Sequence, residues 1–152
     1  MINVLVWIAL CLSVGFAGSW ATLPEIAGWY QEIQKPHWNP PNWIFGPVWT
    51  TLYVLMGIAA SRIWNKRKEV NVRLPLGLFA VQLFLNLCWS LIFFRGHMLL
   101  GALVEVAVLC AAILLTAKSF WKIDRAAGYL LLPYLMWVSF AGFLNFVIWR
   151  IN

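Results

Sequence analysis

The chain has 152 residues, of which 63% are hydrophobic and only 11% are charged. The charged side chains are too few to cover the surface of a globular protein, so this composition excludes a soluble domain. The formal net charge of +6 resembles that of nucleic-acid-binding proteins. The basic residues, however, fall in short connections between apolar stretches, so we expect no nucleic-acid partner.

Five apolar stretches of roughly 20 residues follow one another, each long enough to cross the hydrocarbon core of a bilayer. We expect membrane spans at about 2–23, 43–64, 74–94, 98–120 and 127–149. The connections are short except for the segment around 24–42, and no stretch remains for a soluble domain. The sequence therefore predicts an all-α fold, with residues 1–152 forming a single five-helix transmembrane domain.

Basic residues in the short connections predict the orientation in the membrane. They are Lys66, Arg67, Lys68 and Arg73 between the second and third spans, and Lys118, Lys122 and Arg125 around the connection between the fourth and fifth. Both connections should be cytoplasmic in a bacterial inner membrane, with the N-terminus on the same side. A mitochondrial outer membrane is the alternative location.

The segment from Trp29 to Tyr53 is rich in tryptophan and in proline, which stands at positions 36, 40, 41 and 47. These prolines prevent a continuous helix and favour a stiff, extended path. Aromatic rings are favourable at a membrane–water boundary, where one end can be apolar and the other wet. We interpret the segment as an aromatic lid over a flat, apolar ligand.

Three of the expected spans each carry aromatic and hydrogen-bonding side chains at helical spacing. They are Trp49 and Tyr53 in the second span, Gln82, Asn86, Trp89 and Ser90 in the third, and Tyr134, Trp137, Ala141, Leu144 and Asn145 in the fifth. We expect these faces to line a cavity beneath the lid. The alternative is ordinary interhelical packing, in which buried amides bond between helices without binding a ligand.

Neither a metal site nor a cofactor site is indicated. Cys11, Cys88 and Cys110 all lie within spans and without CxxC spacing, so we expect them to act as small packing residues. Glu105 is the one acidic residue well inside a span. An intramembrane carboxyl is a candidate for proton coupling, but no basic residue lies at matching depth. We interpret Glu105 as structural or as part of a contact between protomers.

Several short motifs follow one another along the chain. They are Lys35-Pro36, Trp38 and Pro40-Pro41, then Trp49-Thr50, Leu52-Tyr53 and Met56-Gly57, then Asn86, Trp89 and Phe93-Phe94, then Pro133-Tyr134, Trp137 and Leu144-Asn145. In this order and spacing they resemble the TspO/MBR family of tryptophan-rich sensory proteins and translocator proteins, also known as peripheral-type benzodiazepine receptors.

The resemblance implies a five-helix bundle, commonly a homodimer, that binds porphyrins and other tetrapyrroles, isoquinoline carboxamide drugs and, in animals, cholesterol. By matching motif, the implied ligand-binding residues are Tyr30, Pro40, Trp49, Tyr53, Asn86, Trp89, Ser90, Trp137, Ala141 and Leu144. The family's sterol consensus needs a tyrosine between Leu144 and Arg150, where this chain has Phe146. That departure counts against cholesterol recognition.

Three functions are compatible with these observations. The first is a transporter or regulator that binds porphyrin in an aromatic pocket, in contact with membrane lipid. The second is a light- and oxygen-dependent porphyrin-degrading enzyme, for which the resemblance implies Trp49 and Trp137 as the catalytic residues. The third is a sensor or scaffold that signals through the cytoplasmic loops. We expect the first function.

Overall fold

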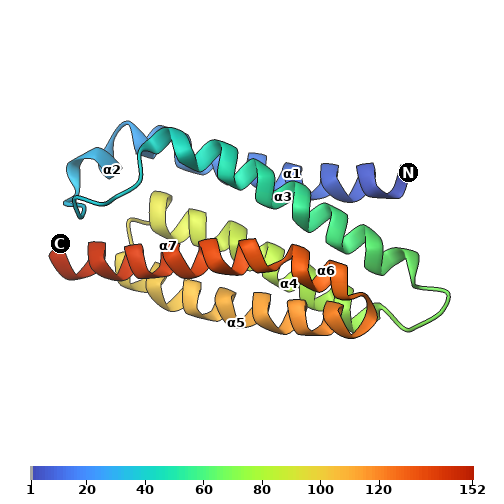
Figure 1. The fold of residues 1–152 in the computed structure, drawn as a ribbon. Coiled ribbons are helices and arrows are strands. Elements are labelled where there is room, and N and C mark those ends of the chain that lie inside the picture. The colour runs from blue at the N-terminus through green and yellow to red at the C-terminus, as the bar shows by residue number, and fades with distance from the viewer. Residues whose placement is uncertain (1) are drawn as a thin grey trace.

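The computed structural model describes residues 2–152, which form a bundle of helices and, within that range, no strand (Figure 1). The helices are α1 (Ile2–Ile26), α2 (Trp29–Glu32), α3 (Asn42–Asn65), α4 (Arg73–Ser90), α5 (Leu99–Ile123), α6 (Arg125–Leu130) and α7 (Leu132–Ile151). A π-helical segment, Leu91–Arg95, continues α4. Within residues 2–152, five helical stretches are long and apolar enough to cross a membrane.

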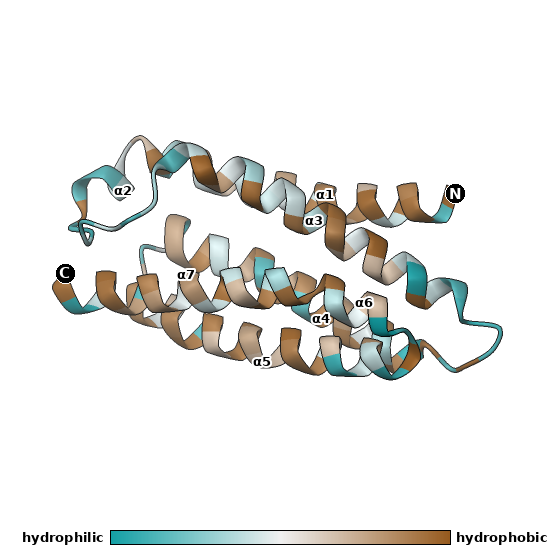
Figure 2. Cartoon of the chain, in the orientation of Figure 1, coloured by the Kyte–Doolittle hydropathy of each residue, from teal (hydrophilic) through white to brown (hydrophobic). Residues whose placement is uncertain are grey.

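The predicted all-α membrane bundle is confirmed. Each observed membrane-spanning stretch overlaps one predicted span, and the largest difference is a few residues at the end of α1, which continues to Ile26, and at the end of α5, which continues to Ile123. Figure 2 shows apolar residues along the lengths of the helices and polar residues concentrated at their ends and in the connections. This is the pattern that a bilayer imposes on a helical bundle.

Helices α1 and α3 pack closely because glycine replaces side chains at their contact. A Cβ atom on Gly57 would lie 2.5 Å from the Cα atom of Ile8, so only glycine fits there. A Cβ atom on Gly15 would likewise lie 2.5 Å from the ring of Tyr53. These contacts hold the α1–α3 pair together between the N-terminus and the middle of α1.

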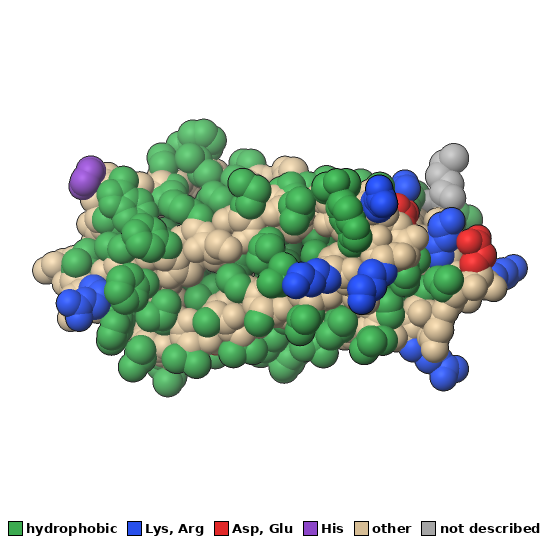
Figure 3. Space-filling model, turned by 60° about the horizontal axis from the view of Figure 1, so that its bottom comes forward, with side chains coloured by type: hydrophobic (Ala, Val, Ile, Leu, Met, Phe, Trp, Pro, Cys, Tyr) green, Lys and Arg blue, Asp and Glu red, His purple; other side chains and the backbone are tan. Residues whose placement is uncertain are grey.

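One end of the bundle carries most of the basic side chains (Figure 3). The Nε atom of Arg62, near the end of α3, donates a 2.7 Å hydrogen bond to Oδ2 of Asp124, which links α5 to α6. The Nδ2 atom of Asn3 donates to Oδ1 of Asn65 at 3.1 Å, so the start of α1 lies at this same end. The short helix α2 and the C-terminus lie at the opposite end (Figure 1).

Candidate ligand cavity

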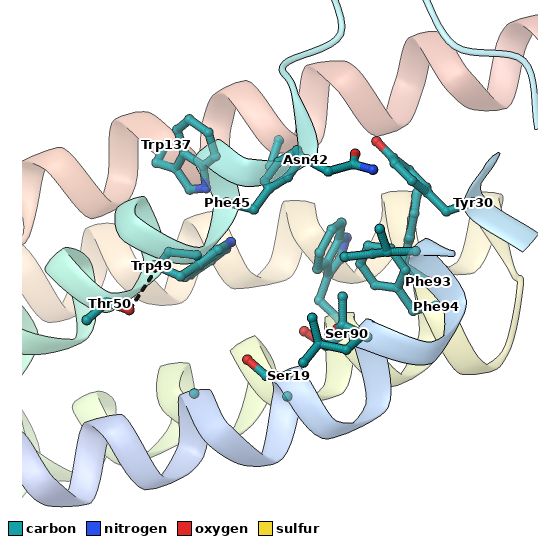
Figure 4. Close-up of a pocket in the computed structure, with 18 of the residues that line it drawn as sticks. Ser19, Tyr30, Asn42, Phe45, Trp49, Thr50, Ser90, Phe93, Phe94 and Trp137 are labelled. Atoms are coloured by element: carbon teal, nitrogen blue, oxygen red, sulfur yellow. Dashed lines mark hydrogen bonds between the residues drawn. The ribbon is translucent and has the colours of Figure 1, made fainter. Parts of the chain in front are cut away.

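A cavity of about 510 Å³ lies in the half of the bundle nearest α2. Its walls come from α1, α3, the α4 end with its π-helical continuation, and α7 (Figure 4). The lining residues are Leu12, Gly15, Phe16, Gly18, Ser19, Thr22, Leu23, Ile26, Tyr30, Asn42, Trp43, Phe45, Gly46, Trp49, Thr50, Tyr53, Trp89, Ser90, Phe93, Phe94, Trp137, Ala141, Leu144, Asn145 and Ile148. This volume lies in the range of small-molecule binding sites.

The cavity is aromatic and uncharged. Among its lining residues, all in the described part of the chain, none is Asp, Glu, Lys or Arg. The Trp137 ring lies 6.0 Å from the Phe45 ring, and both face the same space (Figure 4). The indole Nε1–H of Trp137 is buried and has no hydrogen-bond partner within residues 2–152. Because a buried donor without an acceptor is costly, this N–H is available to a ligand atom that accepts a hydrogen bond.

The π-helical segment places adjacent phenylalanines at the cavity. Leu91–Arg95 follows α4 directly, and the N–H of Gly96 closes its last turn on the carbonyl of Leu91 at 2.8 Å. Phe93 and Phe94 both line the cavity, with ring centroids 4.8 Å apart. In a regular α-helix neighbouring side chains point about 100° apart around the helix axis. A π-helical turn changes this angle, and such turns often lie at functional sites.

A hydrogen-bonded group of buried side chains lies beside the cavity. The Tyr53 hydroxyl donates to Oδ1 of Asn86 at 2.7 Å, and Nδ2 of Asn86 donates to the Tyr134 hydroxyl at 2.7 Å. This bridge joins α3, α4 and α7. The Trp49 ring packs against both tyrosines, with centroids 5.7 Å from Tyr53 and 6.3 Å from Tyr134. The bridge therefore holds the rings that support Trp49.

The end of the cavity is covered by α2 and residues 33–41, which together we call the lid. Tyr30 of α2 lines the cavity, is buried, and its hydroxyl donates to Oδ1 of Asn39 at 3.2 Å. The ammonium of Lys35 donates to the carbonyl of Tyr30 and lies 4.7 Å from the centre of its ring. Burial raises the pKa of the Tyr30 phenol, while its bond to Asn39 acts in the opposite direction.

The lid is attached to the C-terminal part of α7. The backbone N–H of Gln34 donates to Oδ1 of Asn152 at 3.0 Å, and Nδ2 of Asn152 donates to the carbonyl of Gln34 at 2.8 Å. The indole of Trp38 stacks on Phe143, with centroids 5.6 Å apart and an interplanar angle of 13°. These contacts close the end of the bundle above the cavity.

The structure brings most of the residues predicted to bind a ligand to one cavity. Those that line it are Tyr30, Trp49, Tyr53, Trp89, Ser90, Trp137, Ala141 and Leu144. Pro40 lies in the lid and is not a lining residue, and Asn86 is engaged by both tyrosines instead of facing the cavity. Ligand contact at any of these positions stays a prediction.

The wall formed by α1 was not anticipated from the sequence. Gly15, Gly18, Ser19 and Thr22 line the cavity at the spacing of one helical face. Their signal in the sequence is a stripe of small and hydroxyl residues, which is also the pattern of close helix packing. The cavity face of α1 carries a single aromatic ring, that of Phe16, and no tryptophan or tyrosine of the kind by which the other helices were recognised.

The chain is similar to known proteins over most of its length. The sequence profile of the TspO/MBR family matches residues 7–150. A protein of Chlorobaculum tepidum named tryptophan-rich protein TspO is 48% identical over 95% of this chain and 92% of its own length. Protein CrtK of Rhodobacter capsulatus is 39% identical over 90% of this chain and 86% of its own length. The human translocator protein is 38% identical, over 90% and 82% respectively.

Proposed function

The chain belongs to the TspO/MBR family, and from that premise we propose that it binds a porphyrin or related tetrapyrrole in the aromatic cavity and acts as a transporter or regulator of porphyrin handling. The observation that carries the proposal is the uncharged cavity of about 510 Å³ with Trp49, Trp89 and Trp137 in its wall. Isoquinoline carboxamide drugs, which also combine flat rings with a hydrogen-bond acceptor, are proposed as further ligands of the same cavity.

The chemistry of the lining favours a flat, mostly apolar ligand. Aromatic side chains stack on a planar ring system with little loss of conformational entropy. The Trp137 N–H, which has no partner within residues 2–152, favours a ligand with an acceptor, and a pyrrole-derived nitrogen or a carbonyl oxygen supplies one. A carboxylate is costly in a cavity without a cation, so the propionates of a porphyrin should lie at its boundary with the lid or the membrane surface.

The proposal is tested by measuring the affinity of the purified protein for protoporphyrin IX in the dark. We expect Trp49→Ala and Trp137→Ala each to weaken binding several-fold while the bundle stays folded. Trp121→Ala is the matched control, because Trp121 packs edge-to-face with Tyr129, with centroids 4.4 Å apart, at the basic end of the bundle and is not a lining residue. Unchanged affinity in both cavity variants would overturn the proposal.

A second candidate function is the light- and oxygen-dependent breakdown of the bound porphyrin. The supporting observation is that the oxidisable ring of Trp49 lines the cavity and contacts Tyr53 and Tyr134. Illumination of the complex in air should then yield one discrete product, and Trp49→Phe or Trp137→Phe should abolish its formation while binding survives. Bleaching that free tryptophan reproduces at equal concentration would reject this function.

We also propose that the protein is a homodimer in a bacterial inner membrane with its N-terminus in the cytoplasm. Exposed small residues on membrane-spanning faces, such as Ala17 of α1 and Ala107 and Ala111 of α5, are compatible with close approach of a second copy. The basic end of the bundle, which includes the start of α1, suits the cytoplasmic side. Light scattering in detergent tests the dimer, and accessibility of an N-terminal tag in intact cells tests the orientation.

A further inference from the structure

We propose that the ligand enters and leaves the cavity sideways, from the hydrocarbon of the bilayer, through an opening between α1 and α3. We call this opening the window. Its edges are Phe16, Ser19 and Leu23 on α1 and Trp43, Gly46 and Thr50 on α3. The inference rests on the proposed function, because it names the route by which that ligand reaches the cavity.

The exposure of the lining residues locates the window. Besides Asn42 at the start of α3, the lining residues that are also exposed are the six window residues, all on α1 and α3. The lining residues contributed by α4, its π-helical continuation and α7 are buried or half-buried without exception. Phe16 is 77% exposed and Trp43 is 73% exposed although both face the cavity. The cavity is therefore walled on one side and open on the other.

The packing of α1 and α3 explains why the opening lies where it does. The helices touch at Gly57 and Ile8, and again where Gly15 meets the Tyr53 ring. Beyond Tyr53, towards the lid, α3 presents Gly46, and a Cβ atom there would have no neighbour within 4 Å. With no side chain at Gly46 to fill the space between the helices, the gap stays open along the halves of α1 and α3 that lie nearest the lid.

The window opens at a depth occupied by lipid chains. Phe16 lies ten residues before the end of α1 at Ile26, which corresponds to about 15 Å along a helix. The hydrocarbon core is about 30 Å thick, so the opening extends from the headgroup region to near the middle of the bilayer. The hydroxyl of Thr50 donates to the carbonyl of Gly46 at 2.8 Å, which leaves mainly its methyl group for lipid or ligand to contact.

The route through the end of the bundle is closed by contrast. The lid is held at Asn152 by hydrogen bonds to Gln34 and at Phe143 by the stacked ring of Trp38. Tyr30, the lid residue that lines the cavity, is only 4% exposed. A ligand from the aqueous phase would have to break these contacts, whereas a ligand dissolved in the membrane meets an opening already formed. The window therefore selects membrane-partitioned ligands whose polar groups stay at headgroup depth.

The window is tested by the kinetics of protoporphyrin IX binding to protein reconstituted in liposomes that already contain the porphyrin. Gly46→Trp places a bulky ring in the opening, where the backbone has room for it. Gly77→Trp is the matched control, because Gly77 is an exposed residue of α4 whose Cβ would also have no neighbour within 4 Å. We expect the association and dissociation rate constants to fall together, by about tenfold, in Gly46→Trp alone.

The lid supplies the opposing test. In a protein whose three cysteines are replaced by alanine, Gln34→Cys and Asn152→Cys are joined by a short bifunctional thiol reagent, which fixes the lid to α7. We expect unchanged rate constants in this cross-linked protein.

Rates that fall on cross-linking and not in Gly46→Trp would overturn the window. A lower equilibrium affinity in Gly46→Trp with an unchanged association rate would also overturn it, because the ring would then fill the cavity without obstructing entry. Failure of the unmodified protein to bind at all would instead refute the proposed function.

Discussion

The hydroxyl of Tyr53 and the side-chain amide of Asn86 are joined by a buried 2.7 Å hydrogen bond that ties α3 to α4 beside the cavity. The same amide donates to Tyr134 on α7, so one asparagine satisfies a hydroxyl from each of the neighbouring helices. Asn86 and Tyr134 are 3% and 0% exposed, which leaves water no access to replace the missing partner. The bridge therefore links the stability of the bundle to the position of the Trp49 ring that rests on both tyrosines.

We expect Asn86→Ala to destabilise the protein by about 1 to 3 kcal/mol, because each buried hydroxyl loses its partner. Porphyrin affinity should fall as well, although Asn86 does not line the cavity. Thermal unfolding in detergent measures the first effect and fluorescence quenching the second. The triple variant Asn86→Leu, Tyr53→Phe, Tyr134→Phe should recover most of the stability, since it removes the polar groups together. A triple variant as unstable as Asn86→Ala would show that the bridge is not the cause.

The positions of the spans along the chain were predictable from the sequence because a membrane imposes length and polarity on every helix. Apolar stretches with almost no charge predicted the spans, and the basic connections were predicted to lie together at one end of the bundle. The aromatic side of the cavity was also predictable, because polar and aromatic residues such as Trp89 and Ser90 recur at helical spacing. Spacing alone, however, does not separate a residue that faces the cavity from one that faces a neighbouring helix.

Asn86 and Gly15 show where this limit lies. Asn86 shares a helical face with the lining residue Trp89, yet the phenols of Tyr53 and Tyr134 engage its amide. That outcome depends on how three helices are placed relative to one another, which no single helix encodes. Gly15 has no side chain by which its role could be recognised. It lines the cavity because its backbone lies against the Tyr53 ring.

Gly57→Ala should separate α1 from α3. The added Cβ would lie 2.5 Å from the Cα and 2.7 Å from the backbone nitrogen of Ile8, and a backbone cannot move aside as a flexible side chain does. We expect a loss of roughly 1 to 3 kcal/mol in the free energy of unfolding, the usual cost of overpacking. Gly77→Ala, on the open face of α4, is the control and should be neutral or slightly stabilising. Equal stability of the two variants in thermal unfolding would contradict the close contact.

Asp124 should make the stability of the basic end depend on pH. Partial burial acts to raise the pKa of Asp124, but the hydrogen bond and charge of Arg62, with the backbone N–H groups of Ala126 and Ala127, outweigh it and lower the pKa below its ordinary value. A carboxylate with a lowered pKa stabilises the fold above the unfolded-state value of about 3.9. That contribution is lost as the pH falls through the folded-state pKa.

We therefore expect Asp124→Asn to reduce stability at pH 7 by about 1 kcal/mol or less, because the Arg62 partner is half exposed. The difference from the unsubstituted protein should shrink as the pH falls below the unfolded-state value of about 3.9, and at low pH it should disappear once the pH lies below the lowered folded-state pKa. Asp124→Ala should cost about 1 kcal/mol more than Asp124→Asn at both pH values, because Asp124 also caps α6 by accepting from the N–H of Ala126 at 3.0 Å. A pH-independent difference for Asp124→Asn would refute the ion pair.

Glu105 lies inside α5, and both of its carboxyl oxygens are buried without a hydrogen-bond partner in residues 2–152. A buried polar group without a partner costs about 1 to 3 kcal/mol, so we expect Glu105→Leu to raise the thermal stability of the monomer in detergent. Glu69→Gln is the control, since Glu69 is exposed and pairs with Lys66 only at 3.6 Å, and it should change stability very little. The opposite result would be a Glu105→Leu protein that is less stable and that light scattering shows to be dissociated. It would mean that a second copy of the chain supplies the missing partner. A carboxyl inside a membrane lowers the stability of the protein unless it has a partner. These two variants measure whether Glu105 lowers the stability of a single bundle.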